Sequence, residues 1–560
     1  MSNMNFFRNL LLLFLILSVS LSTAQVTDIT NSDSIAGHIA KYDDQGGILS
    51  WYKPDIPGAG YDHVVKLASE FMKSGVPIEP KTGEKMYFVT CCFHDSNYHD
   101  AEADIIAEDW MHNPACVFAG AVISLAQGYR AYSGDDGYLE VVREMLDYQL
   151  ENGTTPADWP WANVPYASSD PFETIYKGAV RWVDDGMRGD GLHGIEPDKI
   201  GELGYAYLIF YEITGMQKYL DAAINCADAL AKHVRGIAGD LEFFSGAETK
   251  KSPWPFRVNA RTGDVISEYT SNAVDPIKLM DELIRIKDRI KLDEKRASVY
   301  TEARNTAWRW LYSKSGPMKT FIWNGYFEDI QNDPDRSNRV QITPMEMAKY
   351  LIRKPYLDPD IDINVPSLIH WVSSAFCTEN MDAIKEQTWC YAPMGSHTAR
   401  YASVCAMWYE RTGEEWYREQ AYRFFNLATY MTDVTGVVRV GPSWPGSWFS
   451  DGYSDYIRHF MDGLSAIPEW APADEDHLVK SSSVIQTIKY DDQNIKYTTF
   501  DDHSTEVLRV TSKPIQVIVD GKEVPESVSA DKNCWIWEPV EKGGILTIYH
   551  LDGNDISILK

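Results

Sequence analysis

Tyr211-Glu212-Ile213-Thr214-Gly215-Met216 ends one helical pattern, and Tyr219-Leu220 lies at the start of the next. Residues 129–135 and 409–414 have the same form, and each has a further Tyr four residues after its Gly. Because Gly readily adopts the left-handed conformation that ends a helix, each copy predicts an αα-hairpin. The repeat therefore predicts a chain built from helical hairpins over most of its first 470 residues.

Two kinds of helix alternate in this region. The helix after Gly215 is amphipathic, whereas the one before it contains Gly201, Gly204 and Ala206 and is expected to pack on nearly all sides. The first kind predicts an outer ring and the second an inner ring, and six such hairpins closed on themselves form an (α/α)6 barrel. The outer helices are expected near 62–74, 137–151, 217–234, 294–313, 364–376 and 414–431, and the inner helices near 113–131, 199–213, 273–288, 343–353, 397–411 and 454–466.

The two ends of the chain have patterns that differ from the helical region between them. After about residue 475 the sequence has short alternating runs separated by Asp-Gly and Gly-Gly turns, which predict an antiparallel β-sandwich over 478–560. We expect this domain to support the barrel rather than to supply a catalytic base. At the other end, Arg8, an apolar run over 10–21 and small residues at 22–24 predict a signal peptide. The expected organisation is a signal peptide (1–24), a barrel domain (25–475) and a β-sandwich in a mainly α protein exported to the periplasm or beyond.

Composition narrows the class of partner. The chain has 81 acidic and 52 basic residues and a net charge of −29, which argues against binding to nucleic acid or to an anionic membrane. No apolar run after the signal peptide is long enough for membrane insertion. The 18 Trp, 32 Tyr and 20 Phe residues are typical of carbohydrate-active enzymes, although a large Trp-rich core would give the same excess. The sequence leaves the oligomeric state open.

Eight Cys residues occur without a CxxC pair, so a zinc ribbon is not indicated, while one or two disulfides are compatible with export. Residues 91–100 contain His94, Asp95, His99 and Asp100, which could ligate a metal, but nothing fixes a coordination set. We therefore expect no metal and no cofactor. Instead, this segment is expected to fold over the site and to contribute His94 to substrate binding.

In the predicted barrel all inner helices run the same way, so their N-termini and the long loops before them gather at one end, here called the mouth. N-terminal N–H groups and helix dipoles favour an anionic ligand there. His112, His193 and His397 occupy equivalent places before or at the start of inner helices and should lie at this same end. Other polar and aromatic residues in the equivalent loops are Asn272, Gln341, Thr343, Trp444 and Trp448.

These residue types suit β-elimination on a uronic acid, which needs a neutralised carboxylate, a base for the C5 proton and an acid for the C4 leaving group. His193 or His397 is expected to transfer the proton, with Tyr401 or Tyr453 as its partner and Arg188 or Arg400 on the carboxylate. Adjacent helical residues diverge by about 100°, so Arg400 and Tyr401 need not both face the cavity. The remaining candidate substrate-binding residues are Asn272, Trp444, Trp448, His112 and His94.

Two alternatives stay open. A glycoside hydrolase would require two carboxyl groups flanking the scissile bond, for which the candidates are Asp190, Glu196, Asp198, Asp451 and Asp455. A non-catalytic glycan-binding protein would have a site lined by Trp and amides, whereas the His and Tyr residues at the mouth favour an enzyme.

Residues 189–198 and 439–446, together with the order of the three domains, resemble exported (α/α)6-barrel carbohydrate-active enzymes of marine Bacteroidetes-type bacteria. Unsaturated glucuronyl hydrolases and several uronate lyases share this barrel, and the resemblance is greatest to the oligosaccharide dehydratases of ulvan-degradation loci. It implies a carbon–oxygen lyase that removes water from the terminal uronate of an anionic oligosaccharide and leaves a 4,5-unsaturated sugar. A chain-cleaving polysaccharide lyase and a hydrolase of the unsaturated glucuronyl type are the alternatives.

Overall fold

The computed structural model describes residues 34–96, 99–100, 103–180, 189–236, 251–324, 338–379, 381–444, 446–527 and 532–560. The predicted signal peptide and Arg188 lie outside these described residues. Within them, no helix is long and apolar enough to cross a membrane. All eight Cys residues are described and have free thiols, so the disulfides that the sequence allowed are not formed in this structure.

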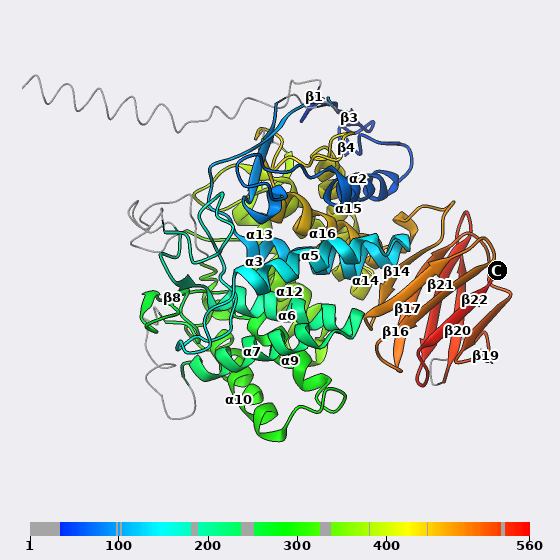
Figure 1. The fold of residues 1–560 in the computed structure, drawn as a ribbon. Coiled ribbons are helices and arrows are strands. Elements are labelled where there is room, and N and C mark those ends of the chain that lie inside the picture. Colours follow the sequence, from blue (N-terminus) through cyan, green and yellow to red (C-terminus); the bar gives the residue numbers. More distant parts are fainter. Residues whose placement is uncertain are drawn as a thin grey trace, which may run out of the picture.

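The described helices form two concentric layers (Figure 1). Each inner segment contacts the next, and the last returns to the first, which closes the ring. The inner segments are α3 (Pro114–Ala121) with a π-helical stretch (Val122–Tyr129) and α4 (Arg130–Ser133), then α6 (Pro197–Thr214), α9 (Val274–Arg285), α12 (Ile342–Arg353), α14 (Gly395–Thr412), and a π-helical stretch (Phe449–Asp455) with α16 (Tyr456–Ala466). The outer helices are α2 (Ala59–Glu70), α5 (Gly137–Asn152), α7 (Gln217–His233), α10 (Glu294–Leu311), α13 (Ile361–Phe376) and α15 (Glu415–Thr429). This alternation agrees with the predicted one.

The repeated glycines end inner helices as expected. Gly134, Gly215 and Gly413 have φ values of 75°, 69° and 71°, in the left-handed region that residues with a Cβ seldom adopt. The N–H of Gly215 donates to the carbonyl of Tyr211 at 2.7 Å and thereby closes the last turn of α6. The same bond recurs between Gly413 and Tyr409. These caps turn the chain directly into α5, α7 and α15.

The carboxyl ends of the inner helices face the C-terminal strands. Gln486 donates to the carbonyl of Glu212 near the end of α6 at 2.9 Å, and Arg285 at the end of α9 pairs with Asp501 at 2.7 Å. The amino ends of these helices therefore lie at the opposite end of the ring, which is the mouth. Short strands precede several of these amino ends: β5 (Cys92–Asp95), β6 (Ile105–Ala107), β7 (Gly194–Ile195), β8 (Arg257–Asn259), β9 (Val265–Ser267), β10 (Cys377–Thr378), β11 (Met381–Lys385), β12 (Pro393–Met394) and β13 (Gly446–Trp448). At the start of the described chain lie β1 (Ser34–Ile35), β2 (His38–Ile39), β3 (Lys41–Tyr42) and β4 (Ile48–Leu49).

Two antiparallel sheets follow the barrel. The first has the order β14 (His477–Ser481), β17 (Ser504–Val510), β21 (Gly544–His550) and β20 (Cys534–Pro539). The second has the order β15 (Ile485–Tyr490), β16 (Asn494–Thr499), β22 (Asp555–Leu559), β18 (Gln516–Val519) and β19 (Lys522–Val524). Buried side chains of both sheets form one hydrophobic cluster, separate from the large core of the helical region. This arrangement fits the expected sandwich, and its boundary near residue 475 stays a prediction.

Candidate functional site

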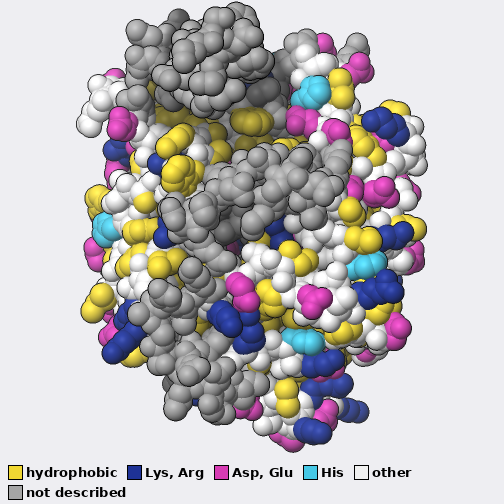
Figure 2. Space-filling view, turned by 90° about the vertical axis from the view of Figure 1, so that its left-hand side faces the viewer, with side chains coloured by type: hydrophobic (Ala, Val, Ile, Leu, Met, Phe, Trp, Pro, Cys, Tyr) yellow, Lys and Arg dark blue, Asp and Glu magenta, His cyan; other side chains and the backbone are white. Residues whose placement is uncertain are grey.

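A cavity of about 1360 Å³ runs through the helical ring. Its lining extends from Trp448 and Asn272 at the mouth to Ser481 and His503 beside the C-terminal sheets. Figure 2 looks onto the mouth end of the molecule, where hydrophobic side chains lie among scattered positive and negative ones. We call this space the central cavity and take it as the candidate site, because it is the place where the chemistry-bearing residues of separate hairpins meet.

Four of the predicted site residues line the central cavity: Asn272, His397, Arg400 and Trp448. Thr343, at the start of α12, lines it as well. Asn272 immediately precedes the residue that caps α9, and Trp448 lies on β13 just before the π-helical stretch Phe449–Asp455. The loops that enter the inner helices therefore contribute side chains to the mouth of the cavity, as the hairpin pattern predicts.

His112 and His193 lie at the mouth end, before α3 and α6, but the structure places neither on the cavity lining. His112 is fully buried beside Tyr176, with ring centroids 5.6 Å apart, and burial lowers its pKa to about 3. His193 packs edge-on against Trp159 at 4.7 Å. The expected roles of both histidines at the site are therefore not supported, because the ring of His112 is enclosed by packing and His193 packs on Trp159 away from the cavity lining.

Tyr401 and Tyr453 also point away from the central cavity. Tyr401 packs on Phe424 of α15 at 4.7 Å, which is the outward orientation anticipated for one of two adjacent helical residues. Tyr453 stacks on Phe71 at 5.0 Å, and its hydroxyl accepts the N–H of Val438 at 3.0 Å. Both are buried, and burial raises the pKa of Tyr401. Neither tyrosine lines the cavity, so this placement does not support the prediction that one of them partners a catalytic histidine there.

His94 and Trp444 lie near the mouth without lining the cavity. His94 is on β5 and pairs with Glu108 at 3.7 Å, whereas Trp444 is 47% exposed on the loop before β13. Their predicted contact with substrate is not supported by this placement. Arg188 lies outside the described residues.

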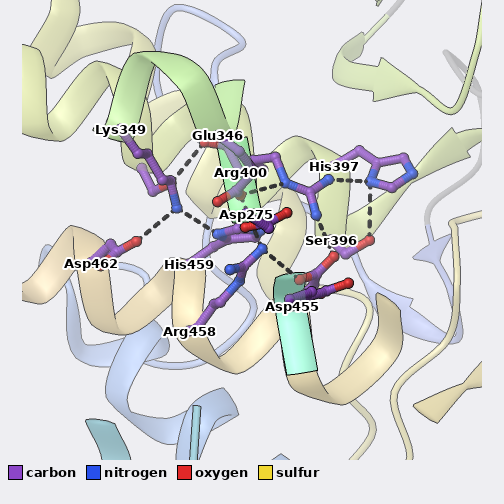
Figure 3. Close-up of polar contacts among 12 residues, drawn as sticks. Asp275, Glu346, Lys349, Ser396, His397, Arg400, Asp455, Arg458, His459 and Asp462 are labelled. Atoms are coloured by element: carbon purple, nitrogen blue, oxygen red, sulfur yellow. Dashed lines mark hydrogen bonds and ion pairs between the residues drawn. The ribbon is translucent and has the colours of Figure 1, made fainter. Parts of the chain in front are cut away.

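One wall of the cavity carries a cluster of ion pairs that joins Arg400 and Asp455 to two residues that sequence analysis missed, Glu346 and Arg458 (Figure 3). Arg458 donates to Glu346 at 2.9 Å and pairs with Asp455 at 2.8 Å. Arg400 reaches the same two carboxylates, with 3.3 Å to Glu346 and a short contact with Asp455. Burial alone would raise the pKa of Glu346, but Arg458, Lys278 and the other cations outweigh it and hold that pKa well below its usual range.

Asp455 behaves in the same way. Burial opposes its ionisation, yet Arg400 and Arg458 lower its pKa below the ordinary value. Glu346 and Asp455 are therefore both ionised at neutral pH. Arg400 is committed to these carboxylates, so it is not available as the sole partner of a substrate carboxylate, which is the role expected from the sequence.

The environment of His397 fixes the position of its proton. Nη1 of Arg400 donates to Nδ1 of His397 at 2.8 Å, because a guanidinium cannot accept. Burial lowers the pKa of His397 well below its usual range, and the charge of Arg400 lowers it further. The neutral ring consequently carries its proton on Nε2. His397 is thus a hydrogen-bond donor rather than the base that elimination would require.

The opposite wall of the cavity holds a carboxyl group whose pKa is raised instead of lowered. Glu202 on α6 pairs with Lys199 at 2.9 Å and lies 3.9 Å from the thiol of Cys116. Burial raises the pKa of Glu202, and Asp275 and Asp455 raise it further, against the opposing charge of Lys199. Next to Lys199, Asp198 is also buried, and its pKa is raised to about 7. The cavity therefore combines a carboxyl group that tends to keep its proton with carboxylates that stay ionised.

The other acidic candidates divide between the cavity and the wall behind it. Asp451 lines the cavity, as Asp455 does. Asp190 is fully buried, pairs with Arg257 at 2.8 Å and accepts from the Ser168 hydroxyl. Glu196 shares Arg257 at 2.8 Å, and neither Asp190 nor Glu196 lines the cavity. These two anchor the loop before α6, so they are structural residues in this arrangement.

A simple spacing would have found the missed residues. Each inner segment directs two residues three positions apart at the cavity. The pairs are Asn113 and Cys116, Lys199 and Glu202, Asp275 and Lys278, Thr343 and Glu346, His397 and Arg400, and Asp455 and Arg458. Residues three apart share one helix face. Charged residues in the first turns of otherwise apolar inner helices were therefore the available signal.

Among the described residues, one grouping could hold a metal ion, and it consists of His38, His99 and Asp433. None of the three lines the central cavity. Among the described residues of the candidate site, Lys199, Lys278, Arg400 and Arg458 are each paired with a carboxylate.

No family model and no curated protein matches the sequence. Several solved structures are similar to part of this chain at low identity. A cellobiose 2-epimerase from Spirochaeta thermophila DSM 6192 is 12% identical with a TM-score of 0.49, over 73% of this chain and 97% of that one. A glycosyl hydrolase family 88 protein from Bacteroides vulgatus is 10% identical with a TM-score of 0.41, over 74% and 100% of the two chains. The unsaturated glucuronyl hydrolase from Bacillus sp. GL1 is 10% identical with a TM-score of 0.39, over 72% and 96%.

These neighbours are an epimerase and hydrolases, and a lyase is not among them. Our expectation of a carbon–oxygen lyase, and with it the dehydratase, is therefore wrong. The site gives a physical reason for the correction. Nδ1 of His397 accepts from Arg400, so the proton of the neutral ring is on Nε2 and this ring is not the base for the C5 proton. Arg400 is paired with Glu346 and Asp455, so it is not free to neutralise a substrate carboxylate.

Proposed function

We propose that the protein is a glycoside hydrolase that acts on uronate-containing oligosaccharides in the central cavity. One observation carries the proposal, namely the coexistence in one cavity of a carboxyl group with a raised pKa, Glu202, and of ionised carboxylates, Glu346 and Asp455. Hydrolysis of a glycosidic bond needs such a difference, because one carboxylic acid protonates the leaving oxygen while a carboxylate acts on the sugar.

The roles follow from the environments. Glu202 is the general acid, because burial and neighbouring carboxylates favour its protonated form. Asp455 is the ionised partner that stabilises positive charge developing on the sugar ring, and Arg400 and Arg458 fix its position. Asp451, on the same π-helical stretch, is the second carboxylate within reach of the cavity.

Substrate recognition uses other lining residues. Trp448 offers an aromatic plane for a sugar ring, and Asn272 offers an amide. When Glu202 is protonated, the charge of Lys199 is no longer neutralised by it, and the ammonium is then able to pair with a uronate carboxylate. The Nε2–H of His397 is a further donor at the mouth. These groups support an anionic rather than a neutral sugar at the acid.

Product analysis tests the proposal. The protein is incubated with uronate oligosaccharides whose terminal residue is either saturated or 4,5-unsaturated, and reducing ends are measured beside ultraviolet absorbance. New reducing ends together with loss of absorbance support a hydrolase of the unsaturated glucuronyl type, and new reducing ends from the saturated substrate support an ordinary glycosidase. Binding without turnover would instead identify a glycan-binding protein and overturn the proposal.

As a second part of the proposal, we infer that the protein is exported. The charged and apolar pattern of residues 1–24 supports it. Cell fractionation and N-terminal sequencing of the mature protein test it, and recovery of the intact N-terminus from the cytoplasm would refute it.

A further inference from the structure

His38, His99 and Asp433 come from three segments that are far apart in the sequence. His38 lies on β2, His99 lies in the loop after β5, and Asp433 follows α15. One potential ligand atom from each residue lies within 4.8 Å of those of the other two. Nδ1 of His99 is in contact with Oδ1 of Asp433. His38 and Asp433 are buried, whereas the His99 side chain is 35% exposed.

Outer hydrogen bonds orient two of the three side chains. The hydroxyl and N–H of Thr435 donate to Oδ2 of Asp433 at 2.6 and 3.2 Å, on the oxygen that does not face His99. Nε2 of His38 donates to the carbonyl of Thr432 at 2.9 Å, so the neutral ring has its lone pair on Nδ1. Trp51 stacks on the ring of His38 at 4.2 Å. A histidine that ligates a metal typically donates its other N–H to a carbonyl in this way.

An ion pair between His99 and Asp433 alone would not explain why His38 lies beside them. The rings of His38 and His99 lie with centroids 5.0 Å apart, and two protonated imidazoles at this distance would repel each other. His99 also has a φ of 72°, in the left-handed region that is costly for a residue with a Cβ. A shared cation accounts for both features, because it needs two neutral imidazoles and one carboxylate turned toward a single point.

We propose that His38, His99 and Asp433 bind one Zn²⁺. Two imidazole nitrogens and a carboxylate oxygen suit zinc, whereas Ca²⁺ and Mg²⁺ prefer sites built from oxygen alone. Three protein ligands leave the fourth tetrahedral position to water, on the side where His99 is exposed. The site is thus separate from the central cavity and independent of the proposed hydrolysis.

The ion would hold the mouth together. It would join the β1–β2 hairpin to the loop after β5 and to the turn after α15. β5 pairs with β13 so that Cys92 lies opposite Trp448, the aromatic residue of the central cavity. Zinc at His99 would therefore stabilise the strand that supports this wall of the cavity, which is a structural role rather than a catalytic one.

Metal analysis of the full chain tests this proposal. The protein, free of any affinity tag, is stripped with a chelator and titrated with ZnCl₂ by calorimetry, and bound metal is then measured by mass spectrometry. We expect one zinc per chain, no binding by His99→Ala or Asp433→Asn, and an affinity about 10–100-fold weaker for Thr435→Ala, as for other outer-sphere changes. Cobalt in place of zinc should give the visible bands of a tetrahedral site.

His94→Ala is the matched control. His94 lies on the preceding strand, its side chain is 42% exposed, and it pairs with Glu108 instead of Asp433. This variant should bind zinc like the unmodified chain. The proposal is overturned if the unmodified chain takes up no zinc, or if His94→Ala loses zinc as completely as His99→Ala does. Because His99 is partly exposed, its variant keeps the test decisive even if Asp433→Asn does not fold.

Discussion

Replacing Glu202 by Gln removes the proposed general acid and preserves the shape of the side chain. An amide cannot release a proton to the leaving oxygen, so the proton must come from water. General acid catalysis contributes about 10²–10⁴ in rate, which corresponds to about 2.7–5.4 kcal/mol at about 1.36 kcal/mol per decade. We expect kcat on uronate oligosaccharides to fall by this amount, with a smaller effect on KM because Lys199 remains in place.

Glu202→Gln should also make the folded protein more stable than the unmodified protein at pH values above the pKa of an unfolded Glu. The pKa of Glu202 is raised in the folded protein, so the native state binds this proton more tightly than the unfolded chain does. Stability is therefore lost as pH rises from about 4.3, the pKa of Glu in the unfolded chain, through the folded value. Gln does not titrate, and the unfolding temperature of Glu202→Gln should exceed that of the unmodified protein increasingly over this range.

Glu212→Gln is the control for this experiment. Glu212 lies on the same helix, lines the cavity at the end near the C-terminal sheets and also has a pKa raised by burial. Its replacement should reproduce the effect on stability without the loss of kcat. The assay is release of reducing ends under saturating substrate, with thermal unfolding followed by circular dichroism. If Glu202→Gln keeps kcat within about tenfold, or Glu212→Gln loses as much, the assignment of the acid fails.

Three further outcomes are expected. Arg400→Met removes one of the two guanidinium groups that neutralise Glu346 and Asp455 and leaves Arg458 alone with both. It should lower the free energy of unfolding by about 3 kcal/mol in urea titrations, the low end for breaking a buried ion pair, and a change below about 1 kcal/mol would contradict the role of this ion-pair cluster. Trp448→Ala should raise KM about tenfold, equivalent to about 1.4 kcal/mol of lost stacking, while Trp444→Ala leaves it unchanged. Burial alone would lower the pKa of His550, but Glu506 at 2.9 Å outweighs it and raises that pKa. The His550–Glu506 pair should therefore make its full contribution to the free energy of unfolding below about pH 6.5 and lose it as pH rises through the folded pKa of His550. The unfolding temperature should fall over that range in the unmodified protein but not in His550→Gln.

The helical pattern was readable because the signal is local. Glycines at the ends of inner helices, amphipathic outer helices and small residues on inner helices are set by neighbours along the chain. The predicted and observed helices agree closely, for example at 294–313 against Glu294–Leu311 and at 397–411 against Gly395–Thr412. Local signals do not reveal the π-helical stretches, whose wider turns depend on tertiary contacts.

The site was harder to predict because orientation is not local. His397 and Tyr401 lie one turn apart on α14, yet His397 lines the cavity while Tyr401 packs against α15. The sequence also placed His112 at the mouth correctly without indicating that Phe118 and Tyr176 enclose its ring. Position along a helix was therefore predictable, whereas the direction of each side chain depended on partners in other elements of the fold, such as Phe424 for Tyr401 and Tyr176 for His112.

Charged residues in an inner helix carry more information than the histidines that first attracted notice. A helix packed on all sides has no place for an ion, since an unpaired buried charge is strongly unfavourable. The Asp275–Lys278 and Asp455–Arg458 pairs are tolerated because both members of each pair face the cavity and carry opposite charges three positions apart. Arg400 then links α14 to the carboxylates of α12 and of the π-helical stretch before α16, and so fixes the proton on His397 and the charge on Asp455 at once. The chemistry of this cavity thus depends less on any one loop than on the closure of the inner ring, which brings these charges within contact distance.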